Sequence, residues 1–270
     1  MYTNLPRNIV EKIREEVAKI KKEYHIINPI IRTDIFEILD KVCIVLRYPL
    51  EDEEANGIHV QRWIKGEKKD FVFINTGNHI EKQVYTAAHE LGHVWRIDEK
   101  VQEQMREPID SEAVINRFAA ELLIPDMHFS YFFTMKCREY GISEETVEDK
   151  DFVRIITFLM NMFMVPYKAI VYRMEEVGIV DTYNRQKLEE IEKDRPEMIT
   201  DCIQAEEYRN IMKTDCQKSM SGLYNMLEQA EADSALSDAK LARIRELFDY
   251  SKRVAGDDGG KITIQSIPKE

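Results

Sequence analysis

The chain has 270 residues, of which 44% are hydrophobic and 33% are charged, and its formal net charge is −12. This apolar content is sufficient for a folded core, whereas the acidic balance argues against nonspecific binding to nucleic acid or to anionic membranes. We find no apolar run of transmembrane length and no signal-peptide layout, so we expect a cytoplasmic protein without a membrane partner. Four scattered cysteines without a C-x-x-C pair are typical of reduced thiols.

The N-terminal part of the chain predicts two helices. Apolar residues recur at helical spacing over residues 5–24, with charged residues between them. The dipeptide Asn28-Pro29 interrupts that pattern, because a residue before proline avoids the helical conformation. A second, shorter helix follows at about residues 34–41.

Three strands follow these helices. Residues 42–48, 57–63 and 71–75 are rich in β-branched and aromatic residues, and Gly66 between the last two predicts a hairpin with a longer loop. Strands followed by helices along the chain are typical of an α+β fold. We therefore predict a small antiparallel sheet packed with helices.

The stretch after the strands, residues 85–95, carries the pattern H-E-x-x-H on a helix. His89 and His93 lie four residues apart, so both imidazoles leave the same helix face and can bind one metal ion. Glu90 can reach a water in an open metal position, where a general base is needed. Gly92 permits the close approach of a neighbouring element. The motif thus predicts a catalytic Zn²⁺ site of the zincin type.

The start of this helix is predicted from its own residues. Asn78 and Glu81 form a possible capping pair, which satisfies backbone N–H groups of the first turn. An apolar stripe then makes the helix half-buried, through Val84, Ala87, Ala88, Leu91, Val94 and Trp95.

A catalytic zinc site usually has a third protein ligand. The carboxylates in range are Asp98, Glu99, Glu103, Glu107, Asp110, Glu112 and Glu121. Glu112 is favoured because it opens an apolar helix, about residues 111–124, that can pack antiparallel to the motif helix. Its alternative role is an ordinary first-turn acid favoured by the helix dipole. Asp110 fits better as a cap, and Glu121 lies on the opposite side of the helix. Asn116, one turn after Glu112, could orient a ligand.

Two signatures together resemble the ImmA/IrrE family of metallo-endopeptidases. Residues 85–93 are similar to its F-T-x-A-H-E-x-x-H helix, and residues 112–125 to its E-x-x-x-N-x-F-A-A-E-L-L-M-P helix. A third, weaker similarity covers residues 164–179, so that the resemblance extends over roughly residues 25–180. The resemblance implies a cytoplasmic zinc peptidase with His89, His93 and Glu112 as ligands and Glu90 as base. Family members typically act on helix-turn-helix repressors.

The chain departs from the family at both ends. Residues 1–27 supply one helix instead of the helix-turn-helix domain that several members carry, so direct nucleic-acid binding is not expected. We place a boundary near residue 180, between a zincin-like domain (1–180) and a helical C-terminal region (181–270) with a flexible tail from about residue 254. Residues 261–267 could form an edge strand. The further helices are predicted at about 152–163, 167–177, 183–193, 198–212 and 236–252.

The sequence therefore predicts a zinc-dependent endopeptidase that cleaves a regulatory protein, such as a helix-turn-helix repressor or an antitoxin-like partner. The alternative is a metallopeptidase fold that captures a regulatory partner with little or no cleavage. An oxyanion in the reaction needs a donor besides the metal. His128, Tyr131 and Arg173 are possible donors, and the sequence does not choose among them.

Overall fold

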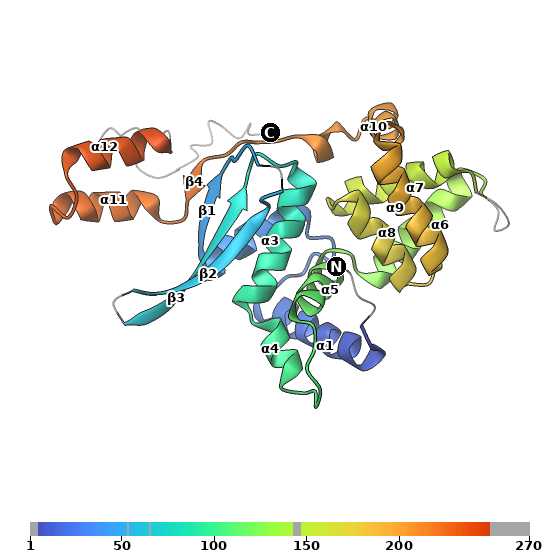
Figure 1. The fold of residues 1–270 in the computed structure, drawn as a ribbon, viewed down its shortest axis with the longest axis horizontal. Helices are drawn as coiled ribbons and strands as arrows, with labels where there is room; N and C mark the ends of the chain where they lie inside the picture. Colours follow the sequence, from blue (N-terminus) through green and yellow to red (C-terminus); the bar gives the residue numbers. More distant parts are fainter. Residues whose placement is uncertain (1–4, 53, 65, 143–146, 249–270) are drawn as a thin grey trace, which may run out of the picture. The chain divides into compact units, whose positions relative to one another are not determined.

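The computed structural model describes residues 5–248 except 53, 65 and 143–146. Internal contacts divide the chain into two compact units, Met1–Ser221 and Gly222–Glu270. The predicted flexible tail from residue 254 and the possible strand at 261–267 lie outside the described residues. The α+β class is confirmed, because the first unit combines one small sheet with many helices (Figure 1).

The sheet has four strands in the order β2-β3-β1-β4. They are β1 (Ile44–Tyr48), β2 (Gly57–Ile64), β3 (Glu67–Asn75) and β4 (Ser219–Met220). β2 and β4 run antiparallel to their neighbours, but β1 and β3 are parallel. The prediction of a purely antiparallel sheet was therefore wrong. β2 lies at the edge of the sheet, and the place between β2 and β1 is filled by β3. The chain turns back from β2 into this place, so β3 runs antiparallel to β2 and parallel to β1.

Two further details of the sheet differ from the prediction. β3 begins at Glu67, because the charged residues before Phe71 pair with the end of β2, so the hairpin connection is short instead of long. β4 has only two residues and comes from a distant part of the chain, which explains why no local pattern predicts it.

The helix that carries the motif, α3 (Ile80–Val94), packs on one face of the sheet. Its other neighbours include α2 (Ile35–Val42), α4 (Ile97–Gln102) and α5 (Ser111–Leu123). α1 (Arg7–Glu23) packs in turn on α5. Ile97 and Val101 of α4 are buried.

The predicted capping pair of the motif helix was wrong. The residue that precedes the helix is His79, and no side chain caps it. Asn78 instead donates from its side chain to Asn56 Oδ1 at 2.9 Å, which ties the β1–β2 connection to the start of α3. A tertiary hydrogen bond thus replaces the local one.

A second group of helices continues the first unit (Figure 1). It comprises α6 (Asp126–Glu139), α7 (Asp149–Phe163), α8 (Tyr167–Glu176), α9 (Thr182–Asp194) and α10 (Pro196–Ala205). The prediction missed α6. Among the described residues no single helix is long and apolar enough to cross a membrane, although α7 and α8, bent by 103° at their junction, reach that length and composition together.

The first unit extends beyond the predicted boundary near residue 180. α9 packs on α8 and α10 on α7, and β4 completes the sheet. Several apolar residues of this stretch belong to the same core, namely Leu188, Ile191, Ile199, Ile203 and Ile211. The many charged residues of these helices favoured the prediction of a separate C-terminal region. Each helix nevertheless has a narrow apolar face that packs into the core.

The second unit contains α11 (Leu223–Ala232) and α12 (Asp238–Leu247). Leu223, Leu227 and Leu241 are buried, and Arg245 pairs with Glu231. The predicted helix at 236–252 corresponds to α12 as far as the described residues reach.

Candidate active site

The two histidines of the motif and the first turn of α5 meet because α3 and α5 pack closely. A methyl group at Gly92 would come within 3.1 Å of side-chain atoms of Ile115 and Phe118. A larger residue than glycine would therefore require the side chains of Ile115 and Phe118 to shift by a few tenths of an ångström. This contact brings Glu112, at the start of α5, over the face of α3 that carries His89 and His93.

Three metal-ligating groups converge at this place. His89 Nε2 and His93 Nε2 lie 3.2 Å apart. Glu112 Oε2 lies 3.4 Å from the first nitrogen, and Oε1 lies 3.5 Å from the second. One ligand atom from each residue lies within 4.8 Å of the others. The structure thus brings together the three predicted ligands.

Asn116 fixes the orientation of the first histidine. Its Oδ1 lies 3.1 Å from His89 Nδ1, and because an amide oxygen only accepts, Nδ1 carries the proton. The Nε2 lone pair of His89 then points toward the carboxylate of Glu112. The Tyr85 hydroxyl donates to the backbone carbonyl of Asn116 at 3.2 Å, so that the motif helix holds α5 at the level of this asparagine.

The electrostatics of the site favour metal binding over protonation of the histidines. Burial lowers the pKa of both His89 and His93, against the opposing charge of Glu112. Neutral imidazoles are the form that binds a metal ion. Glu112 is 62% exposed, so the site opens to solvent on the side of this carboxylate.

Glu90 is buried beside the histidines, under the start of β2. A methyl group at Gly57 of β2 would lie 2.5 Å from Thr86 Cγ2 and 3.3 Å from Glu90 Oε1, so the strand passes closely over α3 here. Burial, together with the nearby charge of Glu112, raises the pKa of Glu90 to about 7. A carboxylate with this pKa can accept a proton near neutral pH.

The rival carboxylates have other partners. Asp110 caps α5, since its side chain accepts from Ala113 N at 3.1 Å. Glu121 faces away from the site and binds Arg173 at 2.9 Å. Asp98 accepts a hydrogen bond from the Ser111 hydroxyl. The cap role of Asp110 and the opposite orientation of Glu121 were both predicted.

The possible oxyanion donors are distributed differently. Arg173 is fully buried, with its guanidinium bound to Glu121 and Glu176 and to the carbonyl of Ile124. It therefore cannot reach a substrate. His128 and Tyr131 lie on α6, in the second group of helices.

One polar group beside the site was not singled out from the sequence. His59 of β2 lies with its ring parallel to that of His93, at 6.2 Å between ring centroids. Its Nε2 lies 2.7 Å from Asp70 Oδ1 of β3, which also accepts from Gln61 Nε2 at 2.7 Å. The available signal was the alternation of strand positions, since His59 and Gln61 follow Gly57 on one face.

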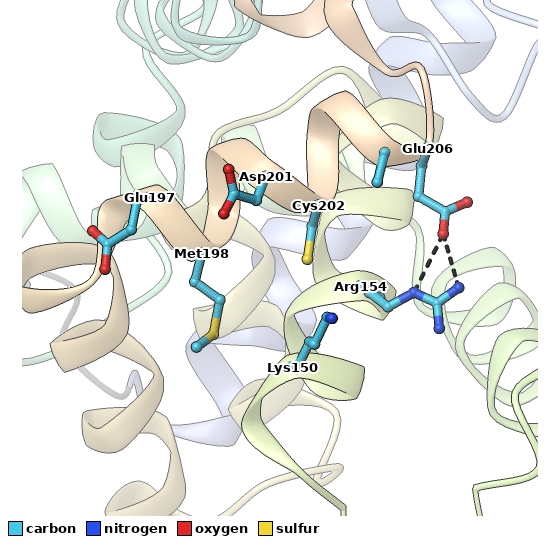
Figure 2. A pocket seen from close by; sticks show the side chains of 8 residues that line it. Lys150, Arg154, Glu197, Met198, Asp201, Cys202 and Glu206 are labelled. Atoms are coloured by element: carbon cyan, nitrogen blue, oxygen red, sulfur yellow. Dashed lines mark hydrogen bonds and ion pairs between the residues drawn. The ribbon is translucent and has the colours of Figure 1, made fainter.

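A cavity of about 560 Å³ lies elsewhere in the first unit, between α7 and α10 (Figure 2). Its residues are Lys150, Arg154, Glu197, Met198, Asp201, Cys202, Ala205 and Glu206. Arg154 is engaged there by Glu206 at 2.9 Å. None of the predicted site residues lines it.

Two imidazoles one turn apart, a carboxylate between them and a second carboxylate on a facing helix define a metallopeptidase-type site of the H-E-x-x-H class. The comparison of family models gives the particular family. Residues 44–175 match the model of the IrrE N-terminal-like domain, peptidase family M78, and this part of the chain belongs to that family. The match confirms the resemblance to ImmA/IrrE. No significant match to a curated protein or to a solved structure is found.

Proposed function

We propose that this protein is a zinc-dependent endopeptidase. The observation that carries the proposal is the convergence of His89, His93 and Glu112 beside the buried carboxylate of Glu90. Two imidazole nitrogens and one carboxylate oxygen are a frequent ligand set of catalytic zinc, in which one position stays open.

The donor set fits a small divalent cation. The protonated Nδ1 of His89 leaves its Nε2 lone pair free, and this lone pair faces the negative carboxylate of Glu112 and the imidazole of His93. Three electron-pair donors at this separation repel one another, and a cation between them removes the repulsion. Imidazole ligands favour zinc over magnesium or calcium.

The roles of the residues follow from their positions. Zinc, when bound, supplies Lewis-acid activation of water and of a peptide carbonyl. Glu90 takes a proton from the attacking water at its carboxylate and delivers it to the leaving nitrogen of the peptide. Asn116 keeps His89 in the tautomer that binds the metal.

An open strand edge beside the site supports a peptide as the substrate. Asn75 N donates to Asn56 O at 2.9 Å, so this pair is hydrogen-bonded, and the pairs alternate along the ladder. The backbone groups of Gly57, His59 and Gln61 therefore point away from β3, on the edge of the sheet. An extended peptide can add to such an edge.

The substrate that we propose is a cytoplasmic regulatory protein, such as a helix-turn-helix repressor. The family resemblance supports this choice. The retained base, Glu90, argues against the alternative of a module that only captures its partner, because binding by the three ligands does not need it.

The test is the substitution Glu90→Gln. We expect this variant to keep one zinc per chain, measured by native mass spectrometry, and to lose on the order of 10²–10⁴ in cleavage rate, because a general base is removed. An internally quenched octapeptide library and a helix-turn-helix repressor serve as substrates, and His89→Ala is the metal-deficient control. Undiminished cleavage by Glu90→Gln contradicts the mechanism. If the zinc-loaded wild type binds the repressor without cleaving it, the alternative function is favoured.

A further inference from the structure

The side chains of His59 and Asp70 form a polar pair next to the candidate metal site, and neither residue is one of the three candidate metal ligands. His59 is on β2 and Asp70 on β3, and the two side chains are only partly exposed. Gln61 donates to the same oxygen of Asp70. The imidazole is therefore held in one orientation from below, by side chains of the sheet.

The orientation leaves one ring nitrogen for a ligand. Since a carboxylate oxygen accepts, His59 Nε2 carries the proton that is donated to Asp70, and in this tautomer Nδ1 is an acceptor. Among the described residues Nδ1 has no hydrogen-bond partner. This acceptor, beside His93, can therefore take a hydrogen bond from a donor outside the chain.

The position of His59 on the strand places this acceptor along the open edge. Positions 57, 59 and 61 share one side of β2, and Gly57 shows that this side faces α3, because its missing Cβ points at Thr86 and Glu90. The backbone of the same positions points to the free edge. A peptide added to β2 would therefore run past the imidazole of His59 as it enters the metal site.

We propose that His59 is a substrate-binding residue, whose Nδ1 accepts a hydrogen bond from a peptide bound along β2, and that Asp70 is its positioning residue. This inference rests on the proposed function, since it assigns a role within the same site. It predicts that His59 contributes to the affinity for the peptide part of a ligand and not to the affinity for its metal-binding group.

Two hydroxamates separate these parts. Acetohydroxamate binds zinc without a peptide backbone, whereas a tripeptide hydroxamate adds peptide N–H groups to the same metal-binding group. For the zinc-loaded full chain with His59→Phe, we expect affinity for the tripeptide hydroxamate to fall about tenfold, as for one lost hydrogen bond, measured by calorimetry. Affinity for acetohydroxamate and the zinc content should stay unchanged. Arg62→Ala, on the same strand but the opposite face, is the matched control.

The other outcomes overturn the proposal. If both hydroxamates lose affinity equally, His59 acts on the metal site through His93. If neither loses affinity, the residue has no role in binding. His59→Gln is the second variant, should the phenylalanine disturb folding as judged by circular dichroism. Because binding is the readout, the result stands even if the protein cleaves none of the tested substrates, which would refute only the proposed function.

Asp70 gives an independent test. Asp70→Ala releases the ring, so tripeptide affinity should fall by about the same factor as in His59→Phe. Asp70→Asn keeps an oxygen that accepts from Nε2 and should restore most of the affinity. Equal losses in Asp70→Ala and Asp70→Asn would contradict an orienting role.

Discussion

At the scale of single residues, the first turn of α5 separates two carboxylates that lie two positions apart. Glu112 points to His89 and His93, whereas Asp110 turns back to cap the helix that carries Glu112. The two carboxylates thus have different roles within one turn, because the backbone is extended at the cap position of Asp110 and helical at Glu112.

This difference predicts opposite results for two alanine substitutions. Glu112→Ala should lower zinc affinity on the order of 100-fold, because one of three ligands is lost, with little change in thermal stability. Asp110→Ala should retain zinc and lose about 1 kcal/mol of stability, the usual value of an N-cap. Competition with a chelator and thermal denaturation measure the two effects. Tight zinc in Glu112→Ala would move the third ligand elsewhere.

At the scale of elements, the separation of α3 and α5 decides whether Glu112 meets His89 and His93. Ile115 and Phe118 of α5 fill the space that Gly92 leaves open on α3. α3 thus packs closely against α5 at Gly92 and against β2 near Glu90. The site is therefore sensitive to helix packing as well as to its ligands.

We expect Gly92→Ala to destabilise the chain by about 1–3 kcal/mol through overpacking, and to weaken zinc binding in the same variant. Ile115→Val removes one of the atoms at 3.1 Å and should restore part of both losses in the double variant. Urea denaturation with and without zinc measures them. Simple additivity of the two substitutions would show that this contact does not control the site.

A buried charge cluster joins α5 to its other neighbours. Glu121 binds Arg117 of its own helix, Arg173 of α8 and Arg14 of α1. Burial raises the pKa of Glu121, but the hydrogen bond and charge of Arg173 and the other two guanidinium groups lower it to about 2. The cluster thus keeps a buried carboxylate ionised.

Because the pKa of Glu121 is lowered in the folded chain, the free energy of unfolding depends on pH in the acidic range. Since the carboxyl has a pKa near 4.5 in the unfolded chain and about 2 in the folded chain, its contribution, about 3 kcal/mol, is present above pH 4.5 and is lost as the pH falls toward 2. Glu121→Gln should flatten the dependence of unfolding free energy on pH in this window. Glu11→Gln, which removes an exposed pair of α1, should leave the dependence unchanged. An unchanged slope in Glu121→Gln would contradict this role.

At the scale of the whole molecule, the first unit needs residues that lie far beyond the matched family domain. The family match ends at residue 175, but α9, α10 and β4 contribute buried residues and one strand to the same unit. The segment from residue 181 to 221 is therefore a part of the fold that carries the site, not an appendage.

Two truncations test this organisation. A chain that ends at Ser221 should be soluble, unfold cooperatively and bind one zinc, because the first unit is complete. A chain that ends at Thr182 should aggregate, since it exposes the surfaces of α7 and α8 that α9 and α10 cover. Gel filtration and zinc analysis decide. A soluble, zinc-loaded chain ending at Thr182 would restore the boundary near residue 180.

The sequence alone determined the features that depend on local spacing. His89 and His93 share a helix face because they are four residues apart, and Glu112 opens its helix because Asp110 caps it. The strands β1 to β3 were visible as short runs of β-forming residues. These signals are contained within one helix turn or one strand, so no tertiary information was needed.

Only the tertiary structure decided the rest. The parallel pairing of β1 with β3 and the two-residue β4 depend on crossover connections and on contacts between distant segments, which have no local pattern. The extent of the first unit depends on narrow apolar faces of charged helices, such as the one with Leu188 and Ile191. The position of His59 beside His93 also depends on tertiary packing, because β2 approaches α3 only in the assembled sheet.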